Sequence, residues 1–135
     1  MTEVRVLIVD DSGAFRSALR DVVAATPGFT VVAEADSGEA AILEVERVLP
    51  DLALIDIRMP GIGGLEAAAQ IVEQRPGTTV VMISADSSGE KIRHTGFLVA
   101  GKSSLRPDTL AALWRNRGSA SARRAREDSN LRPAD

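Results

Sequence analysis

Cysteine is absent from this chain of 135 residues, which excludes disulfide bonds and thiolate metal sites. That absence suits a reducing compartment, so we expect a cytoplasmic protein. No apolar run is long enough to span a membrane. The first run, Val6 to Val9, is broken at once by Asp10 and Asp11, so no secretion signal is expected. The sequence also lacks an internal repeat and a glycine-rich nucleotide loop, and its one histidine, His94, lies in a polar stretch where we expect no ligand role.

Charge is distributed unevenly along the chain. Residues 115–135 hold six arginines and three acidic residues, a formal charge of +3, so the rest of the chain carries −6 within a total of −3. This asymmetry predicts a folded domain over residues 1–116 and a disordered basic tail over 117–135. The tail is too short for a helix-turn-helix, and direct DNA binding is therefore not expected. With 44% hydrophobic residues, the body can bury a core without help from a metal.

Short apolar runs alternate with amphipathic stretches through the body of the chain. The runs predict strands at 4–9, 30–33, 52–56, 79–83 and 97–100. The stretches between them predict helices, with a last helix beginning at Pro107. This alternation is typical of an α/β fold with a doubly wound, five-stranded parallel sheet. Residues 86–96 have loop composition, so the fourth helix is predicted to be short or missing.

Helical periodicity also predicts which side chains face the core. The predicted inward residues lie three or four positions apart along each helix. They are Phe15, Leu19, Val22 and Val23; Ile42, Val45, Val48 and Leu49; Leu65, Ala68 and Val72; and Leu110, Leu113 and Trp114.

Polar side chains follow four of the predicted strands. Asp10 and Asp11 follow the first, Asp56 the third, Ser84 the fourth and Lys102 the fifth. Because parallel strands bring their carboxyl ends to one sheet edge, these side chains should converge there. Clustered carboxylates favour a hard cation such as Mg²⁺, and a lysine and a hydroxyl can hold phosphoryl oxygens. Each residue alone has an ordinary alternative: helix capping for the aspartate pair, a turn residue, a loop serine, or a solvated lysine.

The motifs Leu7-Ile8-Val9-Asp10-Asp11-Ser12, Asp56-Ile57-Arg58-Met59-Pro60-Gly61 with Gly64, Ser84-Ala85 and Lys102 carry a family resemblance. From Val4 to Trp114 the chain resembles the receiver domain of bacterial two-component response regulators. Its first 75 or so residues resemble the subfamily that usually carries a helix-turn-helix output domain.

The resemblance implies a flavodoxin-like receiver fold and a role for each site residue. It makes Asp56 the phosphoacceptor, and it assigns Mg²⁺ to Asp10, Asp11, Asp56 and the backbone carbonyl of Arg58. Ser84 becomes the switch hydroxyl and Lys102 the contact to the phosphoryl group. The implied partners are a sensor histidine kinase or phosphotransfer protein, a downstream protein, and a second copy of the chain in a homodimer.

Three features depart from the family pattern. Ser84 and Lys102 are only 18 positions apart, which shortens the region of the fourth helix and its output surface. Val99 stands where the family has its switch aromatic, and Phe97 should point to the same face one pleat away. Ser103 follows the lysine in place of a frequent proline, so the peptide between them is expected to be trans, since the cis form costs about 2.5–4 kcal/mol.

These observations predict a stand-alone receiver that is phosphorylated on Asp56 and signals by protein contact. Its only expected enzymatic activity is slow hydrolysis of its own aspartyl phosphate. The alternative is an interaction module that works without phosphorylation, as the shortened region and the missing aromatic suggest. An aspartyl-phosphate phosphatase is disfavoured, because such enzymes usually want a second aspartate two residues after the nucleophile, where this chain has Arg58.

Overall fold

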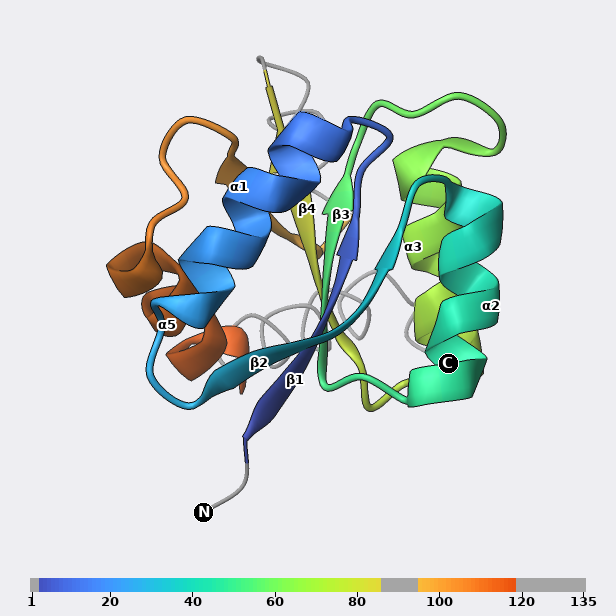
Figure 1. The fold of residues 1–135 in the computed structure, drawn as a ribbon. Helices are drawn as coiled ribbons and strands as arrows, with labels where there is room; N and C mark the ends of the chain where they lie inside the picture. The colour runs from blue at the N-terminus through green and yellow to red at the C-terminus, as the bar shows by residue number, and fades with distance from the viewer. Residues whose placement is uncertain (1–2, 86–94, 119–135) are drawn as a thin grey trace.

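A five-stranded parallel sheet forms the centre of the molecule (Figure 1). A computed structural model describes residues 3–85 and 95–118. The strand order is β2-β1-β3-β4-β5, and all neighbouring strands are parallel. The strands are β1 (Val4–Val9), β2 (Phe29–Ala35), β3 (Leu52–Asp56), β4 (Thr79–Ser84) and β5 (Leu98–Gly101). The predicted flavodoxin-like fold is thereby confirmed.

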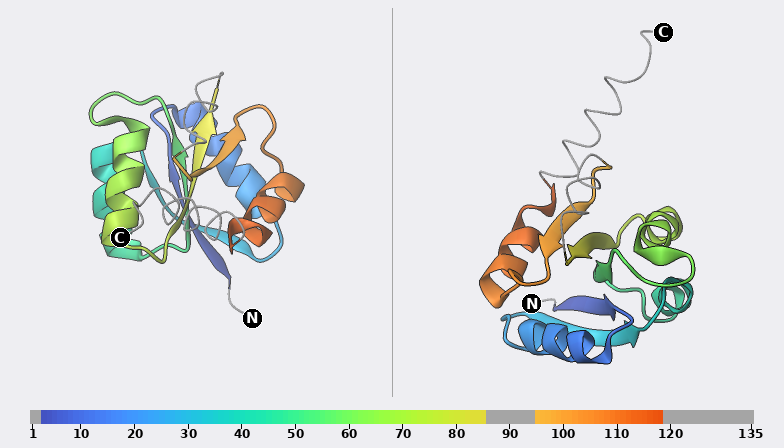
Figure 2. Two further views of the ribbon diagram at one scale, coloured as in Figure 1. Left: turned by 180° about the vertical axis from the view of Figure 1, so that it is seen from behind. Right: turned by 90° about the horizontal axis from the view of Figure 1, so that it is seen from above.

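Helices cover both faces of this sheet. The end-on view of Figure 2 shows α2 and α3 on one face and α1 and α5 on the other. The helices are α1 (Gly13–Ala24), α2 (Gly38–Val48), α3 (Gly63–Gln74) and α5 (Pro107–Arg115). The prediction of a short or missing fourth helix concerns the segment between β4 and β5, of which residues 86–94 lie outside the described part of the chain.

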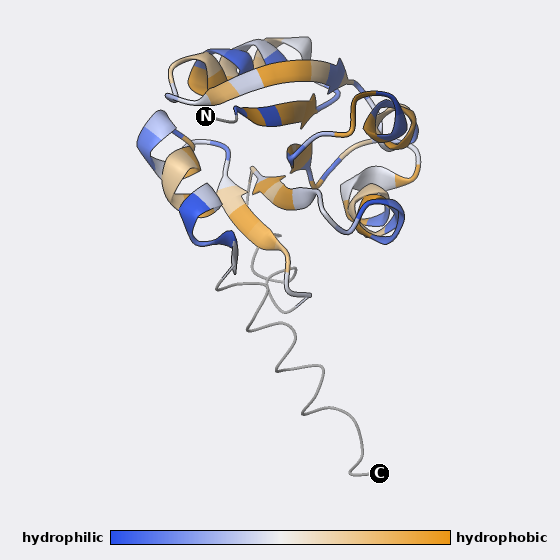
Figure 3. Ribbon diagram, turned by 90° about the horizontal axis from the view of Figure 1, so that it is seen from below, coloured by the Kyte–Doolittle hydropathy of each residue, from blue (hydrophilic) through white to orange (hydrophobic). Residues whose placement is uncertain are grey.

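The hydrophobic core lies in two layers, one on each side of the sheet. Every residue of β3 is buried, as expected for a central parallel strand covered on both faces. Alternate strand residues point to opposite layers, so that Leu7 and Ile55 pack under α2 and α3 while Ile8 and Leu54 pack under α1 and α5. Figure 3 shows that the strands are mainly apolar and that the helices carry polar residues on their outer sides.

Two predicted core residues are exposed instead. Leu49 ends α2 in the left-handed conformation (φ 50°), which turns its side chain outward and leaves it 44% exposed. Leu65 is 39% exposed. The buried stripe of α3 consists of Gly64, Ala67, Ala68 and Ile71. The small residues in this stripe let the helix lie close to the sheet. Because glycine and alanine are only weakly hydrophobic, the sequence gives little indication that they face the core.

The ends of the helices show how the chain enters and leaves the sheet edge. The Ser12 hydroxyl caps α1 by accepting a hydrogen bond from the backbone N–H of Phe15 (3.2 Å). Near the C-terminal end of α5, Trp114 makes an edge-to-face contact with Phe29, and the Arg117 guanidinium stacks on the Trp114 ring. Residues 119–135, which hold most of the predicted tail, are not among the described residues. Within the described ranges, no helix has the length and apolarity needed to cross a membrane.

Candidate phosphoryl-accepting site

The strand ends converge at the carboxyl edge of the sheet, as the sequence predicts. Asp56 is the last residue of β3 and Ser84 the last of β4, and both are buried. Lys102 follows β5 directly, and its backbone N–H donates to the Ser84 carbonyl (2.8 Å). Asp10 follows β1, and its N–H donates to the Ala35 carbonyl at the end of β2 (3.1 Å). Backbone pairing thus holds the ends of neighbouring strands in register around Asp56.

Three carboxylates meet at this edge. Oxygen atoms of Asp10, Asp11 and Asp56 all lie within 4.8 Å of one another. Asp10 is fully buried and Asp56 is 4% exposed, whereas Asp11 is exposed. Two buried carboxylates beside a third repel one another unless a cation neutralises them.

The donor set fits a hard divalent cation. All three side chains offer oxygen, the ligand atom that Mg²⁺ prefers. Asp10 Oδ2 is buried, and the Lys102 ammonium, 3.1 Å away, is its one close polar partner among the described residues. A buried carboxylate oxygen with unused lone pairs, aimed at two further carboxylates, suits a metal ligand.

Lys102 is the cation of the cluster. Its Nζ lies 3.1 Å from Asp10 Oδ2 and 3.4 Å from Asp56 Oδ2, and its side chain is 23% exposed. Burial lowers the pKa of this ammonium, but hydrogen bonding and attraction to Asp10 and Asp56 outweigh burial, so the pKa is raised overall. The lysine therefore stays charged at neutral pH.

Asp56 is in a less favourable environment for its charge. Burial, followed by repulsion from Asp10, raises the pKa of its carboxyl group above the ordinary value. Lys102 and the backbone N–H of Arg58, which lies 3.4 Å from Asp56 Oδ1, offset part of this effect. Added positive charge at the site would favour the ionised form that can act as a nucleophile.

The Asp10 region has a supporting network that sequence reasoning missed. The Ser12 N–H donates to Asp10 Oδ1 (2.8 Å), and Arg16 Nη1 donates to the Asp10 carbonyl (2.7 Å). Arg16 also pairs with Glu34 (3.4 Å), to which Arg20 binds through two hydrogen bonds. The signal for this network in the sequence was the pair of arginines, Arg16 and Arg20, about one and two turns into the helix that begins at the site.

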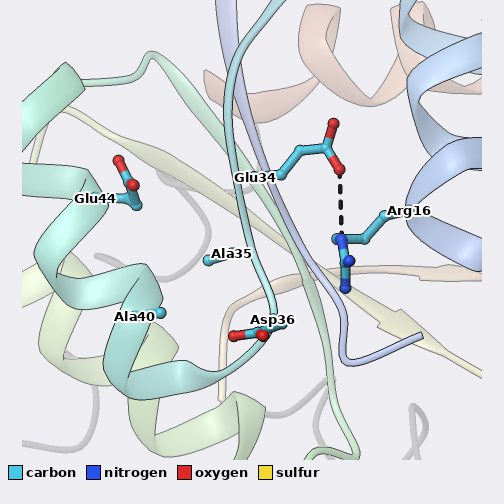
Figure 4. A pocket seen from close by; sticks show the side chains of 6 residues that line it. All are labelled: Arg16, Glu34, Ala35, Asp36, Ala40 and Glu44. Carbon is cyan, nitrogen blue, oxygen red and sulfur yellow. Dashed lines mark ion pairs between the residues drawn. The ribbon is translucent and has the colours of Figure 1, made fainter. Parts of the chain in front are cut away.

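A shallow polar pocket lies beside the Arg16–Glu34 pair of this network. It has a volume of about 310 Å³ and is lined by Arg16, Glu34, Ala35, Asp36, Ala40 and Glu44. Figure 4 shows the Arg16–Glu34 ion pair, with Asp36 and Glu44 nearby on β2's end and on α2. The charge of Arg16 at this pocket is therefore already paired with Glu34.

Close backbone contact fixes the loop after Asp56. A Cβ atom at Gly64 would overlap the Asp56 carbonyl oxygen, so only glycine lets α3 begin this close to β3. The Gly64 N–H donates to the Ile57 carbonyl (3.1 Å). This close contact explains why the motif has glycine at position 64.

Two of the departures from the family pattern lie in or near β5: the aromatic position and the peptide bond after Lys102. Phe97 and Val99 both pack against the core layer under α2 and α3, so they share a face as predicted. No cis peptide bond occurs among the described residues, which confirms the predicted trans linkage between Lys102 and Ser103.

Comparison with known proteins connects this site to a family. The profile of the response regulator receiver domain matches residues 6–101. The response regulator GacA of Pseudomonas viridiflava is 40% identical over 81 residues, which cover 60% of this chain and 38% of the relative. The chain thus spans about two fifths of that relative's length.

Two solved structures are similar along most of their length. The signal receiver domain of the putative response regulator NarL from Mycobacterium tuberculosis has a TM-score of 0.76 at 30% identity, covering 87% of this chain and 98% of that one. A chain in the CheX–CheY–BeF₃–Mg²⁺ complex from Borrelia burgdorferi has a TM-score of 0.63 at 28% identity, covering 73% and 79%.

Proposed function

Because the chain belongs to the family of response regulator receiver domains, we propose that it accepts a phosphoryl group on Asp56 in a Mg²⁺-dependent reaction. One observation carries this proposal: Asp56 is nearly buried, lies 3.4 Å from the Lys102 ammonium and clusters with Asp10 and Asp11. Receiver domains are phosphoacceptors in two-component signalling, and they bind Mg²⁺ at an acidic pocket of this kind. The metal-containing Borrelia burgdorferi complex supports the same assignment.

Each side chain has a defined part in the proposed transfer. Asp10, Asp11 and Asp56, with the Arg58 carbonyl, would hold Mg²⁺, which supplies positive charge against the carboxylates and the incoming phosphoryl oxygens. One Asp56 oxygen forms a bond to phosphorus as the bond to the donor breaks, and the donor keeps that electron pair. Lys102 turns its ammonium from Asp10 to a phosphoryl oxygen, and the Ser84 hydroxyl donates to another.

The donor is a sensor histidine kinase or a phosphotransfer protein, and the site lies in the cytoplasm. The kinase family is the expected donor for a receiver domain, and a phosphohistidine nitrogen is the leaving group. The signal then passes by contact with a downstream protein or a second copy of the chain. Apart from slow hydrolysis of the aspartyl phosphate, the domain itself performs no further reaction.

Intact-mass measurement after incubation with acetyl phosphate tests the proposal. With Mg²⁺, the wild type should gain one phosphoryl group, and Asp56→Asn should gain none. Asp36→Asn is the matched control, because Asp36 is an exposed aspartate at the end of β2 on the same sheet edge. A phosphoprotein that persists in Asp56→Asn, or forms equally well with a chelator present, would refute the assignment.

A second candidate is an interaction module that works without phosphorylation. Val99 at the usual position of the switch aromatic favours it, because valine cannot supply a rotating ring. Amide NMR spectra with and without beryllofluoride and Mg²⁺ separate the two functions. A receiver should shift signals in β4, β5 and α5, whereas this second candidate predicts shifts confined to Asp10, Asp56 and their neighbours.

A further inference from the structure

The Phe15 ring lies against the charged end of Lys102. The Nζ atom of Lys102 is 4.3 Å from the ring centroid, within the distance at which an ammonium is attracted to an aromatic face. The same nitrogen contacts Asp10 and Asp56. The ammonium is therefore held by two carboxylates and one uncharged aromatic face.

The ring is placed by the same residue that orients Asp10. Ser12 donates its backbone N–H to Asp10 Oδ1 (2.8 Å), and its hydroxyl accepts the backbone N–H of Phe15 (3.2 Å). Phe15 also packs against the core layer under α1 and α5, which limits its rotation. Ser12 and the first turn of α1 thus fix both the Asp10 carboxylate and the Phe15 ring.

We infer that Phe15 is a positioning residue that keeps the Lys102 ammonium beside Asp56 during phosphoryl transfer. The reason lies in the difference between its three partners. Asp10 and Asp56 are the carboxylates assigned above to Mg²⁺ and to the phosphoryl group, so their oxygens become engaged elsewhere. The ring has no lone pair to give to a metal and stays available to the ammonium. The attraction of an ammonium to a ring face does not require one N–H bond to point in one direction. The Nζ atom can therefore turn from Asp10 to a phosphoryl oxygen while it stays over the Phe15 ring.

A plain core role for Phe15 makes a different prediction, and Phe29 provides the comparison. Both phenylalanines pack against the same core layer, but Phe29 contacts Trp114 instead of Lys102. If Phe15 only fills space, then Phe15→Leu and Phe29→Leu should affect the site equally. If Phe15 positions the lysine, only loss of the Phe15 ring should slow phosphorylation of Asp56.

The first measurement needs no metal and no phosphorylation. The chain contains only two lysines, Lys91 and Lys102, so that a Lys91→Arg variant assigns their NMR signals. A proton above an aromatic face is shifted upfield by the ring current. In the metal-free wild type, the ε-methylene protons of Lys102 should lie upfield of the usual lysine position. Phe15→Leu should abolish this shift, and Phe29→Leu and Phe15→Tyr should keep it.

The second measurement is the initial rate of Asp56 phosphorylation by acetyl phosphate at saturating Mg²⁺. Phe15→Leu should be about three- to tenfold slower, in line with the strength of a partly desolvated cation–π contact. Phe15→Tyr, which keeps the aromatic face, should recover most of the rate, and Phe29→Leu should match the wild type.

The outcomes separate this inference from the proposed function on which its second part rests. An unshifted Lys102 signal in the wild type overturns the inference, as do equal rates for the Leu and Tyr variants or an equal loss in Phe29→Leu. If the wild type takes up no phosphoryl group on Asp56, the proposed function fails. The lysine signal then decides by itself whether the ring holds Lys102.

Discussion

The Lys102 ammonium lies closer to Asp10 (3.1 Å) than to Asp56 (3.4 Å), the proposed phosphoacceptor. The lysine therefore bridges the two carboxylates. An ammonium has three donors, so it can release Asp10 and keep Asp56 or a phosphoryl oxygen. The geometry thus lets the Lys102 ammonium leave Asp10 without losing its place beside Asp56.

Mg²⁺ should stabilise the fold through these carboxylates. Binding to the native state alone adds RT ln(1 + [L]/Kd), about 2.7 kcal/mol at a free concentration one hundred times Kd. Thermal unfolding with increasing MgCl₂ should raise the midpoint of the wild type and leave that of Asp10→Asn nearly unchanged. Asp21→Asn, an exposed aspartate on α1, is the control and should respond as the wild type does. Equal responses of Asp10→Asn and Asp21→Asn would contradict the metal assignment.

Without metal, Asp56→Asn should be more stable than the wild type at neutral pH. The native pKa of Asp56 is raised above the ordinary 3.8, first by burial and then by Asp10. A raised carboxyl pKa means that the native state binds a proton more tightly than the unfolded state does. Wild-type stability therefore falls as pH rises through the native pKa. We expect a difference on the order of 1 kcal/mol at pH 7, as for other relieved buried charges.

Urea unfolding in the presence of a chelator measures this difference. The advantage of Asp56→Asn should shrink as the pH falls through the native pKa toward 3.8, and it should be gone below 3.8, where both states of the wild type are protonated. An advantage that grows toward acid pH would show that the native pKa of Asp56 is lowered instead.

The arrangement at the sheet edge could be predicted from the sequence because it depends on the backbone. Apolar runs mark the strands, parallel strands end at one edge, and Asp10, Asp56, Ser84 and Lys102 each follow or end such a run. The residue types then indicate the chemistry. Which carboxylate the lysine prefers could not be read in this way, since it depends on side-chain distances that differ by tenths of an ångström.

Other features left too weak a signal in the sequence. The inward face of α3 includes Gly64, Ala67, Ala68 and Ile71, so periodicity was right for Ala68 and wrong for the more hydrophobic Leu65, which is exposed. Phe15 was predicted as a core residue, and its contact with a lysine far along the chain follows only from the folded sheet edge. Close packing and contacts between distant residues override local pattern in both cases.

Gly64→Ala should damage both the fold and the site. The added methyl group would overlap the Asp56 carbonyl oxygen, which forces either the start of α3 or the end of β3 to move. Overpacking of this kind costs about 1–3 kcal/mol or more, and the shift should also slow phosphorylation of Asp56. Gly77→Ala is the matched control, because a Cβ there meets open space, and it should change stability by no more than about 0.5 kcal/mol. Equal effects at the two glycines in urea unfolding would argue against the close contact.

Glu34 should give the opposite pH dependence to Asp56. Its pKa is lowered, chiefly by the hydrogen bonds from Arg20, with burial opposing and the attraction of Arg20 and Arg16 adding to the effect. A lowered native pKa adds stability that is present above the unfolded value near 4.5 and is lost as pH falls through the native pKa. The wild type should therefore be slightly more stable than Glu34→Gln at pH 7, and the two should converge in acid.

The Glu34 effect can be separated from general acid unfolding by a double-mutant cycle with Arg20→Gln. Because the two side chains are joined by hydrogen bonds of 2.7 and 3.0 Å, each single variant should remove the same pH-dependent stability, and the double variant should lose little more. Urea midpoints measured from pH 7 down to pH 3 test this. Additive losses in the double variant would mean that Glu34 is stabilised mainly by Arg16, the residue that also binds the Asp10 carbonyl.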